Sequence, residues 1–148
     1  MKILLAYDGF PQSDHALERT VELAAEDGGE VTVMSVVPPD ARGSKSGGHV
    51  GIRPHAHEDV ARAHESLAAQ GIASEMRIEH GEPSEEILRV AEEGGYDLVV
   101  VGSRGLGRLG RLMLGSVSTD VVSGSSRPVL VVAKDGSERI EPGSATTS

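Results

Sequence analysis

Apolar runs alternate with helical patterns along this chain, and that alternation restricts the possible folds more than any other feature of the sequence. Five runs have the composition of strands, at residues 2–7, 30–37, 74–79, 97–102 and 128–133. Three of them are almost continuously apolar, which is typical of strands buried on both faces of a parallel sheet. Between these runs, apolar residues recur at the spacing of amphipathic helices, at residues 12–27, 56–70, 83–93 and 116–124. The pattern predicts an α/β fold with crossover helices between parallel strands.

Two segments fall outside the alternation. Residues 38–57 are rich in Gly, Pro and Ser, and they predict a mobile loop within the domain. Residues 134–148 predict a disordered tail. A chain of 148 residues suits a single domain, which we assign to residues 1–133.

The amino-acid composition limits the kinds of partner that this chain is expected to bind. The formal net charge is −9, with 14 basic and 23 acidic residues, so the chain as a whole repels a phosphate backbone. Two Tyr, one Phe and no Trp leave few rings to stack on bases. No apolar run approaches the roughly 18 residues of a membrane span. We therefore expect a cytoplasmic protein that binds neither nucleic acid nor membrane.

The segment "VVVGSRGLGRLGRLMLGS" at residues 99–116 contains five glycines, three arginines and no acidic residue. Gly105, Gly107 and Gly110 satisfy G-x-G-x-x-G, but they follow the fourth strand and no acidic residue stands 20 positions later. The frame from Gly110 to Ser116 lacks the lysine of a P-loop. Neither a dinucleotide fingerprint nor a P-loop describes this segment.

A third phosphate-binding pattern fits this segment better than these two. It consists of Gly102-x-x-Gly105, nine further residues and then Gly115-Ser116. Glycines allow backbone N–H groups to face phosphate oxygens without a Cβ in the way. Ser116 opens the last predicted helix, whose amino end attracts anions. Arg104 lies within the spacing, so the loop is expected to hold an anion at the carboxyl ends of the strands.

At this point the chain resembles the universal stress protein family, in its ATP-binding subclass, over about residues 1–133. The resemblance is carried by Ala6-Tyr7-Asp8, by "SVV" at 35–37, by "HGEP" at 80–83, by "DLVVVGSRG" at 97–105 and by "GSVS" at 115–118. It implies an open five-stranded parallel sheet of order 3-2-1-4-5 with helices on both faces, similar to the adenine-nucleotide α-hydrolases. It also implies ATP as ligand, usually with Mg or Mn.

The resemblance assigns nucleotide contacts but no catalytic residue. The contacts it implies are Ala6, Tyr7, Asp8, Val36, Gly102, Arg104, Gly105, Gly115, Ser116, Val117 and Ser118. Phe10 departs from the family, which more often has Ser there, and it lies beside the expected adenine end. From its sequence position alone, Asp8 could also cap the first helix.

Two functional classes stay open. The first is a nucleotide-dependent regulatory or stress-response protein, with at most slow ATP hydrolysis. The second is an ATP hydrolase or related nucleotide α-hydrolase, but "YDGFPQSD" at 7–14 lacks the hydroxyl- and glycine-rich loop typical of that class. We favour the first class. The apolar run at Val129–Val132 predicts a sheet edge that needs covering, and the resemblance implies a homodimer through it.

Overall fold

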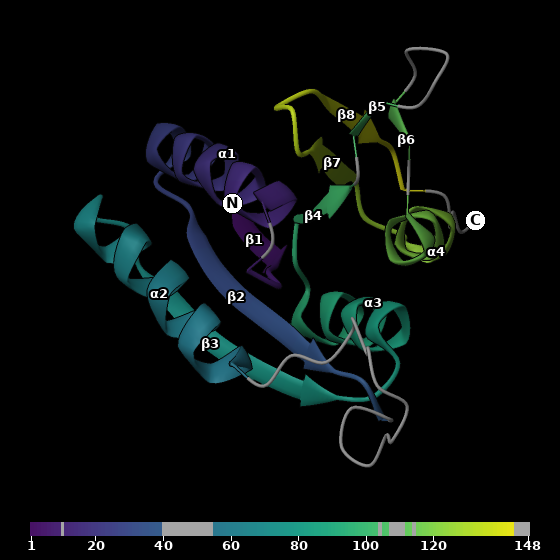
Figure 1. The fold of residues 1–148 in the computed structure, drawn as a ribbon. Helices are drawn as coiled ribbons and strands as arrows, with labels where there is room; N and C mark the ends of the chain where they lie inside the picture. The colour runs from purple at the N-terminus through teal and green to yellow at the C-terminus, as the bar shows by residue number, and fades with distance from the viewer. Residues whose placement is uncertain (10, 40–54, 104, 107–111, 114, 144–148) are drawn as a thin grey trace.

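The computed structural model describes residues 1–9, 11–39, 55–103, 105–106, 112–113 and 115–143. Its main sheet has six strands in the order β3-β2-β1-β4-β7-β8 (Figure 1). The strands are β1 Lys2–Ala6, β2 Glu30–Val37, β3 Ser74–His80, β4 Leu98–Ser103, β7 Val129–Ala133 and β8 Glu138–Glu141. The first five in this order are parallel, which confirms the predicted α/β class and strand order.

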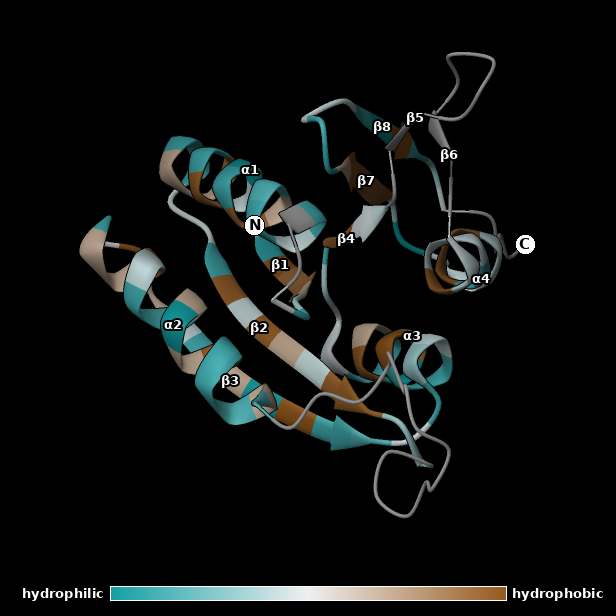
Figure 2. Cartoon of the chain, viewed as in Figure 1, coloured by the Kyte–Doolittle hydropathy of each residue, from teal (hydrophilic) through white to brown (hydrophobic). Residues whose placement is uncertain are grey.

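Helices cover both faces of this sheet, as predicted. They are α1 Pro11–Asp27, α2 Ala56–Ala69, α3 Pro83–Gly94 and α4 Ser116–Gly124. One apolar cluster packs α1 and α2 against one face, and a second packs α3 and α4 against the other. Strand β7 carries almost only hydrophobic residues, whereas α1 and α2 alternate between hydrophilic and hydrophobic ones (Figure 2). The central strands are therefore buried on both faces.

The parallel register brings two distant turns to one edge. Ile3 of β1 lies between Val31 of β2 and Leu98 of β4. The chain leaves β1 toward α1 and leaves β4 toward the glycine-rich segment at the same carboxyl edge of the sheet. Strand order changes direction here, since β2 follows β1 on one side and β4 flanks it on the other.

The sixth strand corrects the predicted five-stranded sheet and the predicted disordered tail. Strand β8 pairs antiparallel with β7 across a tight turn. In that turn the Gly136 N–H donates to Ala133 O at 2.9 Å, and Asp135 Oδ1 accepts from the Ser137 N–H at 3.0 Å. Gly136 has φ +90°, which glycine adopts without steric cost. Residues 144–148, the rest of the predicted tail, lie outside the described residues.

Strand β8 also occupies the sheet edge that we expected to be open at Val129–Val132. All residues of β7 are buried. The premise of the predicted dimer surface is therefore wrong, whereas the homodimer itself stays a prediction.

Two smaller differences concern the loops. Of the predicted loop at 38–57, residues 56 and 57 belong to α2, because the helix begins at Ala56, and residues 40–54 lie outside the described part. A short antiparallel pair, β5 Gly105–Leu106 with β6 Leu112–Met113, was not predicted. Within the described ranges, no helix has the length and apolar character needed to cross a membrane.

Candidate functional site

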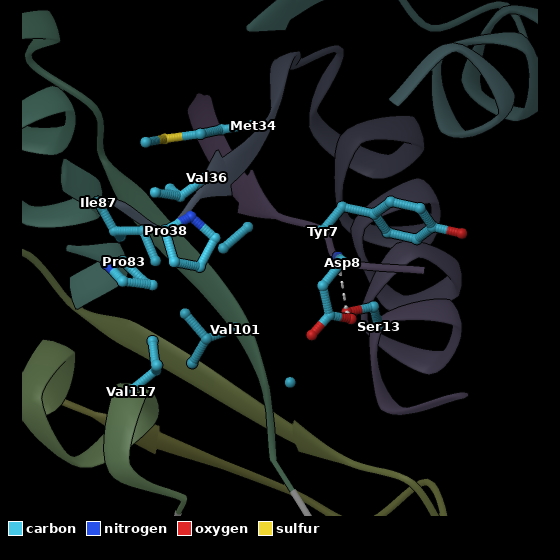
Figure 3. Close-up of a pocket in the computed structure, with 12 residues that line it drawn as sticks. Tyr7, Asp8, Ser13, Met34, Val36, Pro38, Pro83, Ile87, Val101 and Val117 are labelled. Carbon is cyan, nitrogen blue, oxygen red and sulfur yellow. Dashed lines mark hydrogen bonds between the residues drawn. The ribbon is translucent and has the colours of Figure 1, made fainter. Parts of the chain in front are cut away.

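A cavity of about 290 Å³ opens at the carboxyl edge of β1 and β4, where the sequence predicts a ligand site (Figure 3). It lies where the strand order changes direction, the usual position of ligand sites in open α/β sheets. The lining residues are Ala6, Tyr7, Asp8, Ser13, Met34, Val36, Pro38, Pro83, Ile87, Val101, Gly102 and Val117. Six of the predicted contacts are among them.

One side of the cavity is apolar. Met34 and Val36 come from β2, and Pro38 follows that strand. Pro83 and Ile87 face them from the first turns of α3 (Figure 3). This wall offers a flat ring dispersion contacts and removal from water, and its described members carry no charge.

Asp8 supplies the acidic group on the other side of the cavity (Figure 3). Its Oδ1 accepts a hydrogen bond of 2.5 Å from the hydroxyl of Ser13, a buried residue of α1. The same hydroxyl accepts the Asp8 N–H at 3.2 Å. Two bonds thus fix the turn between β1 and α1, and they hold the carboxylate at the cavity wall. The capping and ligand-binding interpretations of Asp8 are compatible in this geometry.

Tyr7 lines the cavity differently from the residues around it. Its ring points away from the other lining side chains (Figure 3), and it packs in the cluster under α1 and α2. Burial raises the pKa of its hydroxyl to about 12, and the 2.6 Å hydrogen bond that it donates to Asp14 acts in the same direction. Its N–H donates to Met34 O at 2.8 Å. Tyr7 therefore shapes the site through its backbone.

Gly102 has a structural reason to be glycine that the sequence did not reveal. A Cβ built at this position would lie 2.8 Å from Gln12 Cγ and 3.1 Å from the Gln12 carbonyl carbon. The amino end of α1 thus packs directly on the end of β4. Close approach to a ligand is consistent with this contact, but the fold alone already requires a residue without a side chain here.

The amino end of α4 borders the cavity through Val117. Helix geometry leaves the first N–H groups, those of residues 116–118, without intrahelical acceptors. Gly115 is the residue before the helix, and its carbonyl accepts the first intrahelical bond, from Thr119 at 2.9 Å. The predicted phosphate end therefore presents N–H donors that have no acceptor within the helix, together with the positive end of a helix dipole.

The two serines of this turn differ. Ser116 is exposed, so its hydroxyl is available to a ligand. Ser118 is buried, and its hydroxyl accepts the Gly115 N–H at 2.9 Å. Ser118 therefore caps the helix with its side chain. Its backbone N–H is then the group that could make the predicted phosphate contact.

Among the predicted contacts that the structure describes, Gly105, Gly115, Ser116 and Ser118 do not line the cavity. Arg104 lies outside the described residues, and Gly105 belongs to β5. Sequence reasoning missed six lining residues: Ser13, Met34, Pro38, Pro83, Ile87 and Val101. A search for chemical motifs overlooks the five apolar members, although Pro38, Pro83 and Val101 lie close to a predicted strand end or at the predicted start of a helix. In the described part of the chain, no group of three or more His, Asp or Glu side chains is arranged to hold a metal ion.

Comparison with known proteins agrees with this geometry. Residues 1–133 match the Universal stress protein family. Universal stress protein YxiE of Bacillus subtilis is 36% identical over 144 residues, which cover 88% of this chain and 97% of that protein. Universal stress protein of Thermus aquaticus, encoded 3′ of a QAH/OAS sulfhydrylase, is 38% identical over 136 residues, covering 88% and 96%.

Solved structures share the fold. A universal stress protein in complex with cAMP superimposes with a TM-score of 0.69 at 26% identity, covering 89% of this chain and 96% of that one. The universal stress protein of Archaeoglobus fulgidus in complex with dAMP gives a TM-score of 0.66 at 25% identity, covering 88% and 96%.

Proposed function

This chain belongs to the universal stress protein family, and on that premise we propose that its cavity binds an adenine nucleotide, with ATP as the ligand. The observation that carries the proposal is the division of one cavity into an apolar wall, a fixed carboxylate and the amino end of a helix. These three features suit a base, a ribose and a phosphate chain. The cAMP and dAMP complexes of structural neighbours support the adenine class.

Each part of the nucleotide has a proposed contact. Adenine lies against the wall formed by Val36, Pro38 and Ile87. The ribose hydroxyls donate to Asp8, because a carboxylate accepts hydrogen bonds and repels phosphate. The phosphates lie at the amino end of α4, near the N–H groups of Ser116 and Val117. Arg104 and the backbone of Gly105 supply further phosphate contacts in this proposal.

A divalent cation, Mg or Mn, accompanies the phosphates in this proposal. Magnesium in nucleotide sites keeps several waters and binds mainly phosphate oxygens, with one or two carboxylates. The described cavity does not offer an all-protein cage, since its acidic lining side chain is Asp8 and Asp8 is assigned to the ribose. The ion would therefore be held by phosphate oxygens and water. The ion would neutralise phosphate charge in a chain of net charge −9.

We propose a regulatory role in the stress response, as a cytoplasmic, homodimeric binding protein whose state depends on the bound nucleotide. The alternative is an ATP hydrolase. Steady-state assays should give a turnover number far below the enzyme median of about 10 per second. A value at that median, abolished by one substitution in the cavity, would instead favour the hydrolase.

Thermal unfolding with a panel of ligands tests the binding proposal. If the dissociation constant is micromolar, millimolar Mg-ATP should stabilise the fold by about 4 kcal/mol. Adenosine should stabilise less, because it lacks the phosphates, and GTP should stabilise least, because its base is shaped differently. Mass spectrometry of small molecules released from the purified protein is an independent readout. The proposal would be overturned if the protein is folded and its melting temperature does not change when ATP, AMP or adenosine is added.

A further inference from the structure

A groove of about 460 Å³ lies between α1 and α2, on the face of the main sheet that these two helices cover (Figure 1). It is separate from the nucleotide cavity, because the two share none of their described lining residues. The groove is lined by Asp14, Leu17, Glu18, Val21, Glu22, Ser66 and Gln70.

The floor of the groove is apolar, and its wall on α2 is polar without charge. Leu17 is buried and Val21 is half-buried, and both side chains pack in the cluster between α1 and the sheet. Ser66 and Gln70 form the wall on α2, and both are exposed. An apolar floor at the surface favours a partner that brings apolar side chains of its own.

The wall on α1 is a row of carboxylates. Asp14, Glu18 and Glu22 follow one another at intervals of four residues, which places them on successive turns along one side of the helix. The row is about 12 Å long, because an α-helix rises about 1.5 Å per residue. At one end of the row, the Asp14 carboxylate accepts the Tyr7 hydroxyl at 2.6 Å. Glu18 and Glu22 are therefore the carboxylates that a partner would contact.

The charge of Glu18 and Glu22 is accessible from solvent. Their side chains are 73% and 68% exposed, and each has a basic neighbour on α1, His15 at 3.5 Å and Arg19 at 3.1 Å. Exposed pairs of this kind contribute little and leave the carboxylates open to other partners. The surrounding surface has the same sign, since α1 carries five acidic residues and one arginine, and α2 carries three and one. The arginine of α2, Arg62, lies at the other end of the row, beside the Tyr7 hydroxyl.

We propose that this groove docks a basic amphipathic helix of a partner protein. The apolar stripe of that helix lies on Leu17 and Val21, and its lysines or arginines lie along the carboxylates of Glu18 and Glu22. The row of about 12 Å corresponds to about two turns of the docked helix. Charge complementarity selects a basic partner, because an acidic or phosphate-bearing surface would be repelled. This surface is distinct from the nucleotide cavity, so the proposal does not depend on nucleotide binding.

Fluorescence anisotropy with a labelled probe peptide tests the proposal. The probe is a peptide of about 15 residues, long enough to form a helix, with leucines along one side and lysines along the other. A second peptide has the same composition in scrambled order. The first should bind with a dissociation constant on the order of 100 µM at low salt, and the scrambled peptide about tenfold more weakly. Raising the salt from about 0.05 M to about 0.5 M should weaken binding about tenfold, because screening shortens the reach of the carboxylates.

Matched variants separate the groove from the overall charge. Glu18→Lys and Glu22→Lys each reverse one charge in the groove and should weaken binding of the amphipathic peptide about fivefold or more. Glu85→Lys makes the same change at an exposed position of α3, on the other face of the sheet, and should weaken it by less than about twofold. Val21→Ser should weaken the amphipathic peptide but not the scrambled one, since it removes apolar contact alone. Circular dichroism establishes that each variant is folded.

Four outcomes would overturn the proposal. The first is a folded wild-type protein that does not bind the amphipathic peptide at about 1 mM. The second is equally tight binding of the scrambled peptide or of spermine, which would show that the groove attracts any polycation. The third is equal weakening by Glu18→Lys and Glu85→Lys, which would attribute binding to net charge. The fourth is a change of oligomeric state in Glu22→Lys, measured by sedimentation velocity, which would assign the groove to a second copy of this chain.

Discussion

The hydroxyl of Ser13 donates a 2.5 Å hydrogen bond to Oδ1 of Asp8. It also accepts the backbone N–H of Asp8 at 3.2 Å, so one buried side chain fixes both the turn and the carboxylate that follows β1. Ser13 is therefore a positioning residue for Asp8, and the two should affect ligand binding in a related but unequal way.

Ser13→Ala should weaken adenosine binding about three- to tenfold, because one hydrogen bond that orients the carboxylate is lost. Asp8→Ala should weaken it further, since it removes the acceptor itself. Calorimetric titration with adenosine and with 2′,3′-dideoxyadenosine measures both effects. The wild type should prefer adenosine, and both variants should lose part of that preference. Ser123→Ala, on the exposed side of α4, is the control. Equal preference in Ser13→Ala and the wild type would contradict a positioning role.

Ser116 and Ser118 should respond to the same substitution in opposite ways. Ser118→Ala removes the acceptor of the Gly115 N–H, so it should destabilise the fold by about 1 kcal/mol and lower the melting temperature by roughly 2–4 °C. Ser116→Ala removes an exposed hydroxyl and should leave stability unchanged while it weakens ATP and spares adenosine. Thermal melts with and without each ligand measure both properties. A stable Ser118→Ala protein with impaired ATP binding would show that the capping assignment is wrong.

The sequence predicted the fold well wherever local signals agree with the packing. The Gly28-Gly29 pair predicted the end of α1, which closes at Asp27, and Pro83 predicted the start of α3. Strand β8 was missed because the tail was judged by its polar composition. Asp135-Gly136 is a strong hairpin signal after an apolar strand, and it was the local feature that could have revealed the hairpin.

The candidate site was predicted in its location but less well in its chemistry. The cavity lies at the carboxyl edge because the strands are parallel. Parallel strands can be predicted from short-range apolar patterns in the sequence. The bond between Ser13 and Asp8 depends on how the chain turns from β1 into α1, and no spacing rule encodes that path. Likewise, Gly102 was interpreted as one of the glycines that let a ligand approach the backbone, whereas its contact with Gln12 depends on how α1 lies against β4.

Alkaline titration should reveal the buried hydroxyl of Tyr7. Its pKa rises to about 12 in the folded protein from an unfolded value of 10, because burial disfavours the phenolate. The stability that this shift represents is fully present below pH 10 and is lost as pH rises toward 12. At about 1.36 kcal/mol per pKa unit, it amounts to about 2–3 kcal/mol. Urea unfolding between pH 9 and about 11.5 should therefore give a steeper decline for the wild type than for Tyr7→Phe. Parallel curves would contradict a buried, neutral Tyr7.

Gly102 and Gly115 allow a direct comparison between a glycine required by packing and one proposed to serve a ligand. Gly102→Ala puts a Cβ against Gln12, so it should destabilise the fold by about 1–3 kcal/mol whether or not nucleotide is present. Gln12→Ala removes the nearest atom of that contact, and the double variant should be more stable than the sum of the two single changes. Urea unfolding measures each free energy.

Gly115→Val should behave in the opposite way. The backbone at this position has φ −80° and ψ −179°, an extended conformation that a β-branched residue readily adopts. Stability in the absence of ligand should therefore change by no more than about 0.5 kcal/mol. ATP binding should be lost, because the side chain occupies the space where phosphate oxygens approach the amino end of α4. Adenosine binding should persist, since Asp8 and the apolar wall are unchanged. If Gly115→Val binds Mg-ATP like the wild type, the phosphates do not lie at this helix.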